Sequence, residues 1–291
     1  MTAATRGPRV VSIPMTAIRD EMTGAPLGHS TSYPDTYDAA LLFPVPRSPQ
    51  RVEIGVTGAL PFTGADTWTA YELTWLDPHG KPQIAIATLV VPVTSTAIVE
   101  SKSVKLYLGA FAQTRFDGIA DVAATIERDL AHAIGGVAKV ALDVPAQFLS
   151  ARIADLAGES LDDLSAAIQR YHLTPELLVA NGPVVEETLT TSLFRSLCPI
   201  TFQPDFASVQ LAYRGPAIDR AALLRYLVSY RRHPGFHEHC VERIFVDVMA
   251  RCRCETLSVY ARFTRRGGID INPFRTNAGL ATPPNVRTPR Q

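Results

Sequence analysis

The sequence lacks an excess of charge of either sign. Its 28 lysines and arginines are balanced by 28 aspartates and glutamates, so the formal net charge is zero. A protein that binds nucleic acid stably normally carries a basic surplus, because contacts with phosphates dominate that affinity. We therefore expect no nucleic-acid partner, although a weakly charged ligand related to a nucleobase is compatible with this composition.

Long hydrophobic runs are also missing. The longest one, residues 84–93, is about half of the ~20 residues that a membrane helix requires. Residues 1–15 contain no apolar core of signal-peptide length. The sequence therefore predicts no membrane partner and a cytoplasmic location.

Cysteine is scarce, with one residue at each of positions 198, 240, 252 and 254. Without an export signal, these thiols are expected to be reduced rather than paired in disulfides. A zinc site is an alternative, but on one helix His239 points away from the face shared by His237 and Cys240. Cys252 and Cys254 also lack the two-residue gap usual for structural zinc. We expect no bound metal, and we expect Cys240 and Cys252 to pack in the core.

Apolar periodicity predicts the same order of elements, ββααββ, in both halves of the chain. The predicted strands cover residues 68–75, 82–93, 137–144, 184–193, 208–213, 257–263 and 269–271. The predicted helices contain residues 104–111, 122–134, 223–228 and 241–249. Gly135-Gly136 is expected to end the second helix and Asp219 to cap the third.

The predicted fold class is therefore α+β, with two tandem modules that each place helices on one face of an antiparallel sheet. We expect an irregular N-terminal arm at 1–45, a first module at 46–145, a linker at 146–183 and a second module at 184–291. Residues 160–171 of the linker are predicted to be helical. One module cannot cover both faces of its sheet, so we expect modules and chains to pair, the latter as a homodimer.

Cys198 stands in a segment bracketed by Pro199 and Pro204, which predicts an irregular connection between strands, and Asp205 follows in the same connection. A thiol is mostly protonated near neutral pH and needs neighbours that favour the thiolate if it is to act as a nucleophile. Two interpretations are open: a nucleophile beside a carboxyl group, or a small buried side chain followed by a turn aspartate.

His237 and Glu238 open a predicted amphipathic helix. The positive end of the helix dipole should keep Glu238 ionised, so that its carboxylate can accept two neighbouring N–H groups of a flat ligand. His237 is expected to titrate near neutrality and to shuttle a proton. The competing interpretation is a first-turn glutamate that stabilises the helix, with solvated histidines.

Residues 100–107 follow a predicted strand and begin a helix. The hydroxyls of Ser101 and Ser103, with the first N–H groups, are suited to holding an anion beside Lys102. The competing interpretation is a capped, solvated helix start, which we favour for Lys105.

Arg262, Arg265 and Arg266 precede Gly267-Gly268 at the end of a strand. Guanidinium groups bind phosphate oxygens in pairs, so the cluster suits phosphate recognition, although a solvated turn explains it equally well. No Gly-x-Gly-x-x-Gly motif follows a predicted strand, so a dinucleotide would not be held as in a Rossmann fold.

Together, these segments resemble the long, two-module form of the NADPH-dependent 7-cyano-7-deazaguanine reductases, the nitrile reductases of queuosine biosynthesis. The resemblance runs from residue 27 to residue 291 and is loose in the linker. Residues 100–107 match the motif that separates these reductases from GTP cyclohydrolases of the same tunnelling fold. The other matching segments are 198–205, 236–242 and 260–268.

The resemblance implies a reaction in which Cys198 adds to the nitrile to give a covalent thioimide, and two NADPH then reduce it to an aminomethyl group. The implied catalytic residues are Cys198, Asp205 as general acid and His237. The implied substrate-binding residues are Glu100, Ser101, Lys102, His237 and Glu238. The implied NADPH-binding residues are Lys102, Ser103, Arg266 and Gly267.

Two other functions remain as alternatives from the sequence. One keeps the fold but changes the reaction to a zinc-dependent cyclohydrolase, and the other is a non-catalytic protein that binds a base. Stoichiometric zinc in the purified protein would support the first.

Overall fold

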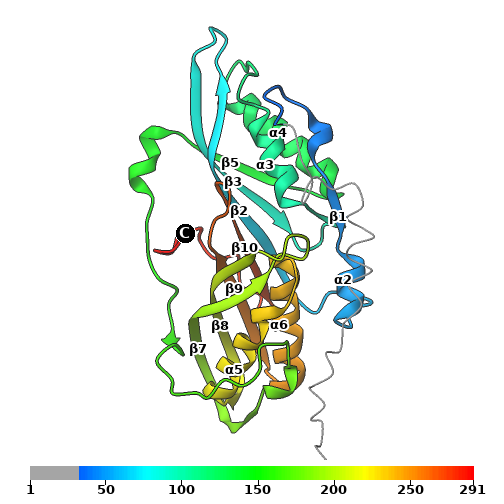
Figure 1. The fold of residues 1–291 in the computed structure, drawn as a ribbon, viewed down its shortest axis with the longest axis vertical. Helices are drawn as coiled ribbons and strands as arrows, with labels where there is room; N and C mark the ends of the chain where they lie inside the picture. Colours follow the sequence, from blue (N-terminus) through cyan, green and yellow to red (C-terminus); the bar gives the residue numbers. More distant parts are fainter. Residues whose placement is uncertain (1–32) are drawn as a thin grey trace, which may run out of the picture.

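The computed structural model describes residues 33–291 (Figure 1). Helical elements are η1 (Ala39–Leu41), α2 (Ser48–Glu53), α3 (Ser101–Gly109), α4 (Ile119–Ile134), η2 (Pro145–Ser150), η3 (Pro175–Leu177), α5 (Arg220–Ser229), η4 (Tyr230–Arg232) and α6 (His237–Cys252). Strands are β1 (Pro44–Pro46), β2 (Thr63–Leu76), β3 (Pro82–Pro92), β4 (Ala97–Val99), β5 (Lys139–Asp143), β6 (Glu159–Ser160), β7 (Ala180–Leu197), β8 (Pro204–Ile218), β9 (Thr256–Phe263) and β10 (Ile269–Thr276). None of the helices in this part of the chain is long and apolar enough to span a membrane.

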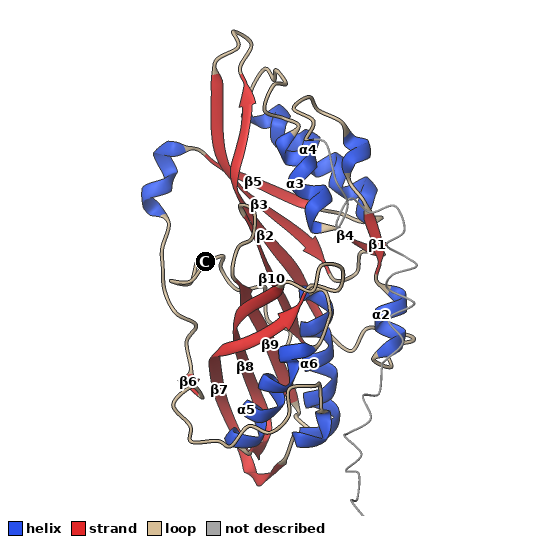
Figure 2. Cartoon of the chain, in the orientation of Figure 1, coloured by secondary structure: helices blue, strands red, loops and turns tan. Residues whose placement is uncertain are grey.

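Both halves of the chain contribute to one eight-stranded sheet, in the order β5-β3-β2-β10-β9-β8-β7-β6 (Figure 2). Neighbouring strands are antiparallel, except that β6 runs parallel to β7. Strand β10 pairs with β2 along its whole length and also with β9. The last strand of the chain therefore joins the two halves.

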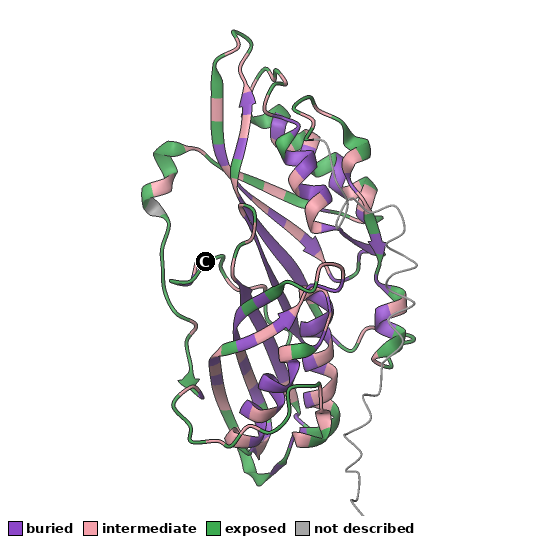
Figure 3. Cartoon of the chain, in the orientation of Figure 1, coloured by how far each residue is buried: buried purple, intermediate pink, exposed green. Residues whose placement is uncertain are grey.

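The four long helices cover one face of this sheet, because the register places their contact residues on the same side. Ile271 lies opposite Trp68, which packs with residues of α3 and α4, and Arg275 lies opposite Val259, which packs with residues of α6. Ile271 and Arg275 are four residues apart on β10 and so share a face. Figure 3 shows the buried strands of this two-layer arrangement.

The predicted mixed α+β class and antiparallel sheet are confirmed, but the repeated ββααββ order is only half correct. The second half has the complete order. The first half ends its sheet with β5 alone, and its strand β2 receives β10 from the other end of the chain. Such pairing depends on contacts between residues that are far apart in sequence, which local periodicity does not encode.

The helix predicted at residues 160–171 is wrong. The segment contains the end of β6 and then an irregular stretch, which begins alongside β7. Leu161 N donates to Thr190 O (2.8 Å), and Asp162 accepts hydrogen bonds from Thr191 Oγ1 (2.6 Å) and Ser192 N (3.0 Å). Contacts with β7 therefore satisfy the polar groups that a helix would have bonded locally.

Part of the predicted irregular arm, residues 1–32, lies outside the described residues. The remainder is ordered by tertiary contacts, since β1 pairs with β4. Tyr37 Oη also donates to Asp129 Oδ2 on α4 (2.8 Å). These contacts hold the segment before α2 against β4 and α4.

Candidate active site

Cys198 lies in a tight connection between β7 and β8. Its backbone N donates to Gln203 O (2.9 Å), and Phe202 N donates to Cys198 O (3.0 Å). These two bonds close a turn in which Phe202 has a positive φ of 58°. Asp205, near the start of β8, pairs with Ser196 on β7. The turn thus places the thiol and the carboxyl group on the same end of the strand pair, both buried.

The start of α6 is fixed beside this turn. Leu197 N donates to His233 O (2.9 Å), and Gly235 N donates to Leu197 O (3.0 Å). The chain then enters α6 at His237. Because Leu197 directly precedes the cysteine, these bonds set His237 and Glu238 next to Cys198.

A cavity of about 340 Å³ collects these groups. Six of the predicted site residues line it: Ser101, Cys198, Asp205, His237, Glu238 and Arg266. Its other walls are mostly apolar, from Trp68, Ile98, Val99, Pro199, Gly235, Phe236 and Ile271. The cavity therefore combines a thiol, two carboxyl groups and an imidazole with surfaces that suit a flat ring.

Asp205 is the centre of the polar wall. Its Oδ1 lies 3.1 Å from Arg266 Nη1 and 3.8 Å from His237 Nε2. The contact with Arg266 is an ion pair without hydrogen-bond alignment, so this buried N–H group still has no acceptor among the described residues. Burial lowers the pKa of His237 to about 4, and the neighbouring Asp205 only partly opposes that shift. The expectation that His237 titrates near neutrality is therefore wrong for the free protein, in which its imidazole is neutral.

The start of α3 is organised differently from the expected anion cradle. The Glu100 carboxylate accepts hydrogen bonds from Lys102 N (2.7 Å) and Ser103 N (2.8 Å). These two N–H groups are therefore already bonded by the N-cap side chain and are not available to an anion. The Ser103 hydroxyl donates to Glu100 O (2.6 Å) and accepts from Phe43 N (3.0 Å). Of residues 100–103, only Ser101 lines the cavity with Cys198.

Lys105 is a site residue that the sequence interpretation missed. It lines an adjoining cavity of about 300 Å³ together with Ser101, Asp205, His237 and Arg266. Burial and the nearby Arg266 lower the pKa of Lys105, so it is not the solvated residue that we favoured from sequence. The available signal was its position four residues after Ser101, which places both on one helix face.

Gly267 gives the Lys105 side chain room to pack. Its φ is +57°, and a Cβ there would lie 3.2 Å from Lys105 Cε. The absence of a side chain lets the lysine stem lie against the turn after β9. Lys105 and Arg266 form a cationic wall, and no carboxylate in the described part of the chain forms an ion pair with Lys105.

The three arginines predicted as one cluster separate in the structure. Arg262 lies on the opposite face of the sheet, where it donates to Tyr260 Oη (2.7 Å) and Gln291 Oε1 (2.8 Å). The Arg265 guanidinium lies 4.8 Å from the centre of the Tyr71 ring. Of the three, only Arg266 lines the candidate site, because it lies in the turn beyond the end of β9 at Phe263 rather than on the strand that carries Arg262.

Glu238 is 3% exposed, and its Oε1 has no hydrogen-bond partner among the described residues. Burial, and secondly the nearby Asp66, raise the pKa of Glu238 to about 8. The expected ionised state is therefore wrong for the free protein, because desolvation outweighs the helix dipole. A buried acceptor without a partner is a polar group that a ligand can satisfy.

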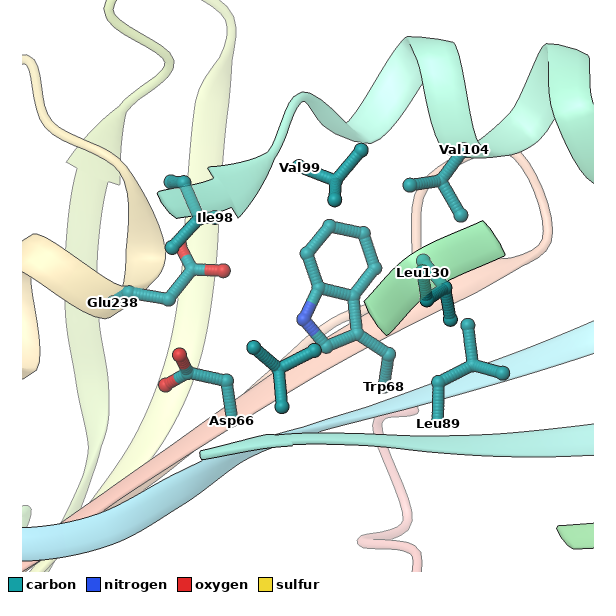
Figure 4. A pocket seen from close by; sticks show the side chains of 9 residues that line it. Asp66, Trp68, Leu89, Ile98, Val99, Val104, Leu130 and Glu238 are labelled. Carbon is teal, nitrogen blue, oxygen red and sulfur yellow. The ribbon is translucent and has the colours of Figure 1, made fainter. Parts of the chain in front are cut away.

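A third cavity, of about 290 Å³, adjoins Glu238 and is otherwise almost entirely apolar (Figure 4). Trp68, Ile98, Val99 and Glu238 line both this cavity and the one that contains Cys198. Trp68, Ile98, Val99 and Phe236 are site residues that the sequence interpretation did not single out. Apolar residues on a strand or a helix start carry the same pattern whether they face a core or a ligand.

A buried ion network holds the elements behind Glu238. Asp66 Oδ2 lies 2.6 Å from Arg47 Nη2, and its Oδ1 lies 2.7 Å from Arg275 Nη1. Glu242 Oε1 pairs with Arg51 Nη2 (2.8 Å) and Arg275 Nη2 (2.9 Å). Burial alone would raise the pKa of Glu242, but the arginines, Arg275 foremost, lower it to about 2. The network ties β2 and β10 to α6, whose first turn carries the site.

The other three cysteines are buried and do not line the cavities. Burial raises the pKa of Cys240 and Cys252 to about 12 and that of Cys254 to about 11. Cys240 and Cys252 pack in the core of the second half, as predicted. Residues 33–291 contain no group of three or more histidine, cysteine, aspartate or glutamate residues placed to hold a metal ion.

The chain is similar to known proteins along most of its length. A family model described as "Nitrile reductase, 7-cyano-7-deazaguanine-reductase N-term" matches residues 33–142, and one described as "QueF-like protein" matches residues 204–281. The chain is 52% identical over 271 residues to the NADPH-dependent 7-cyano-7-deazaguanine reductase of Bordetella avium, which covers 93% of this chain and 99% of the relative. It is 53% identical over 269 residues to the enzymes of the same name from Burkholderia multivorans and Chromobacterium violaceum, with 92% of this chain covered in both cases and 98% and 96% of the relatives. With a cysteine, an aspartate and an unpartnered glutamate meeting in one cavity and this similarity along nearly the whole chain, the protein belongs to the 7-cyano-7-deazaguanine reductase family.

Proposed function

We propose that this protein reduces the nitrile of 7-cyano-7-deazaguanine to the aminomethyl group of 7-aminomethyl-7-deazaguanine, consuming two NADPH per turnover, within queuosine biosynthesis. The observation that carries this proposal is the cavity in which Cys198 and Asp205 lie together with the unpartnered carboxyl group of Glu238. The chain's membership of the reductase family supports the same reaction.

Cys198 is proposed to act first, as the nucleophile. Its sulfur adds to the nitrile carbon, which forms a C–S bond and converts the triple bond into the C=N bond of a thioimide. Asp205 takes the thiol proton and delivers it to the nitrile nitrogen, so no proton is gained or lost overall. The burial of both groups keeps water away from this intermediate.

NADPH supplies one hydride for each of the two reduction steps. After the first, the carbon–sulfur bond breaks, the thiolate of Cys198 leaves and an imine remains in the cavity. The second hydride, together with one proton, converts that imine into the amine, and a further proton taken up from solution restores the thiol of Cys198. His237, next to Asp205, is placed to assist proton transfer to the nitrogen.

Glu238 is proposed to accept the neighbouring N–H groups of the pyrimidine ring in its carboxylate form. Glu100, Ser101, Lys102 and His237 are the other proposed substrate contacts. Ser101 and His237 line the cavity, which supports their roles directly. Glu100 and Lys102 adjoin Ser101 in the chain, and Glu100 also shapes the site by capping α3.

Lys102, Ser103, Arg266 and Gly267 are the proposed NADPH contacts, and we propose Lys105 as a further one because it lines the same cavity as Arg266. The residues fit an anionic, oxygen-rich molecule, because Arg266 carries a buried N–H group without a hydrogen-bond acceptor among the described residues and Lys105 adds a second cation. Phosphate groups are bound well by such a pair.

The larger organisation belongs to the same proposal. We assign two tandem tunnelling-fold modules, 46–145 and 184–291, joined by a linker at 146–183 and preceded by an arm at 1–45. The antiparallel sheet with helices on one face supports this assignment. A homodimer in the cytoplasm is proposed, since the uncovered face and edges of the sheet offer surfaces for a second chain.

The proposal is tested by the decay of NADPH absorbance in the presence of 7-cyano-7-deazaguanine. We expect the Cys198→Ala variant to lose at least about 1,000-fold in kcat, because no other thiol faces the cavity, and Asp205→Asn to lose about 100-fold or more. Cys254→Ala, which changes a buried cysteine outside the cavities, is the matched control and should keep its activity. Turnover by Cys198→Ala at the wild-type rate would refute the proposed reaction.

A further inference from the structure

Trp68 lies between the two parts of the candidate site. It projects from β2 on the helix-covered face of the sheet and is 4% exposed. Its side chain lines the cavity with Cys198 and also the apolar cavity beside Glu238. In Figure 4 the nitrogen-bearing edge of the indole is turned toward Glu238 and Asp66, while the benzene ring points to Val99 and Val104.

The indole Nε1–H group forms no hydrogen bond with residues 33–291. Tryptophan N–H groups in protein interiors usually find a partner, so this donor is available to a ligand in the cavity. Glu238 Oε1, on the same cavity, is also unpartnered. Asp66 is occupied on both oxygens by Arg47 and Arg275. One free donor and one free acceptor therefore face the same space.

Such a pair is complementary to a ring edge on which a carbonyl group and an N–H group are neighbours. In 7-deazaguanine, the C6 carbonyl and N1–H form this lactam edge, and the carbonyl lies between N1–H and the side of the ring that bears the nitrile. An adenine-like ring has the opposite order, with an amino donor at C6 and an acceptor at N1, and would leave both protein groups unpaired.

We propose that Trp68 is a specificity-determining residue whose Nε1–H donates a hydrogen bond to the C6 carbonyl oxygen while Glu238 accepts from N1–H. The proposal rests on the proposed function, which supplies the 7-deazaguanine ring. It also explains why one residue lines both cavities: the C6 carbonyl lies between the atom that Cys198 attacks and the N–H groups that Glu238 binds.

The test compares ligands and variants in a Cys198→Ala background, in which binding is measured without adduct formation. Trp68→Phe keeps an aromatic ring and removes only the donor and part of the indole surface. We expect calorimetric titration to give about three- to tenfold weaker binding of 7-cyano-7-deazaguanine. The analogue that carries hydrogen in place of the C6 oxygen also lacks N1–H and should bind more weakly to every variant, but Trp68→Phe should change its affinity by less than about twofold.

Trp75→Phe is the matched control, since Trp75 is the other tryptophan of the chain, lies on the same strand and is equally buried at 4%. It should leave both affinities unchanged and should make Trp68 the only indole, whose fluorescence is then expected to change when 7-cyano-7-deazaguanine is added. Equal losses for both ligands in Trp68→Phe, or no loss for either, would overturn the role of Trp68 alone. If the Cys198→Ala parent fails to bind 7-cyano-7-deazaguanine, the proposed function falls as well.

Discussion

Cys198 and Glu238 acquire their chemistry from what surrounds them rather than from their residue types. Cys198 faces a cavity with a carboxyl group, whereas Cys240, Cys252 and Cys254 are enclosed by the core or by neighbouring backbone. Glu238 is enclosed too, but one of its oxygens faces the cavity without a partner. The sequence interpretation named both residues, and the structure brings them to one cavity. The interpretation missed Lys105 and Trp68, because their patterns match a solvated helix start and a core strand.

The raised pKa of Glu238 predicts a pH dependence of ligand binding. The free carboxyl group is protonated below a pH of about 8, whereas accepting two N–H groups requires the carboxylate. Binding of 7-cyano-7-deazaguanine should therefore release a proton, and its affinity should rise by up to about tenfold per pH unit between pH 6 and 8. Calorimetry of the Cys198→Ala variant in buffers of different ionisation enthalpy measures this release. The additional Glu238→Gln substitution should abolish it, and an affinity independent of pH in both proteins would contradict the assignment.

At the scale of elements, the N-terminus of α3 resembles an anion-binding site in sequence, but its free N–H groups are bonded by a side chain of the same protein. The serines at its start suggested a cradle for a ligand, but Glu100 satisfies the N–H groups of Lys102 and Ser103. Most element positions were predictable, because strand alternation and helix stripes reflect local burial. Two features could not be predicted, because contacts with strands distant in sequence determine them. They are the pairing of β10 with β2 and the irregular course of residues 160–171.

Glu100→Ala is expected to destabilise the protein by about 1 to 2 kcal/mol, since two backbone donors lose their acceptor in a buried position. Urea unfolding measures the change. Glu100→Gln keeps one acceptor oxygen and should lose less. Asp121→Ala, an exposed substitution in the first turn of α4, should change the free energy of unfolding by no more than a few tenths of a kcal/mol. Equal stability of Glu100→Ala and Asp121→Ala would contradict the capping role.

At the scale of the whole molecule, the two halves are joined by a shared sheet and by the ion network of Arg47, Arg51, Asp66, Glu242 and Arg275. Arg275 is fully buried on β10 and contacts an acid from β2 and an acid from α6. Because α6 also carries His237 and Glu238, the network relates the stability of the fold to the geometry of the site.

Arg275→Met should therefore lower the free energy of unfolding by about 3 to 5 kcal/mol, because it leaves two buried carboxylates short of a partner. Thermal and urea unfolding report the loss. Arg214→Met, which breaks an exposed ion pair with Glu255, is the control and should cost less than about 1 kcal/mol. Similar losses in the two variants would show that the buried network does not hold the halves together.

The proposed reaction depends most directly on capture of the nitrile by one sulfur atom. Intact-protein mass spectrometry of the protein mixed with 7-cyano-7-deazaguanine, in the absence of NADPH, measures that event. We predict a mass increase equal to one whole ligand, since addition expels no atom, and no increase for Cys198→Ala. An unchanged mass, while calorimetry shows the ligand bound to the same folded protein, would contradict the thioimide mechanism.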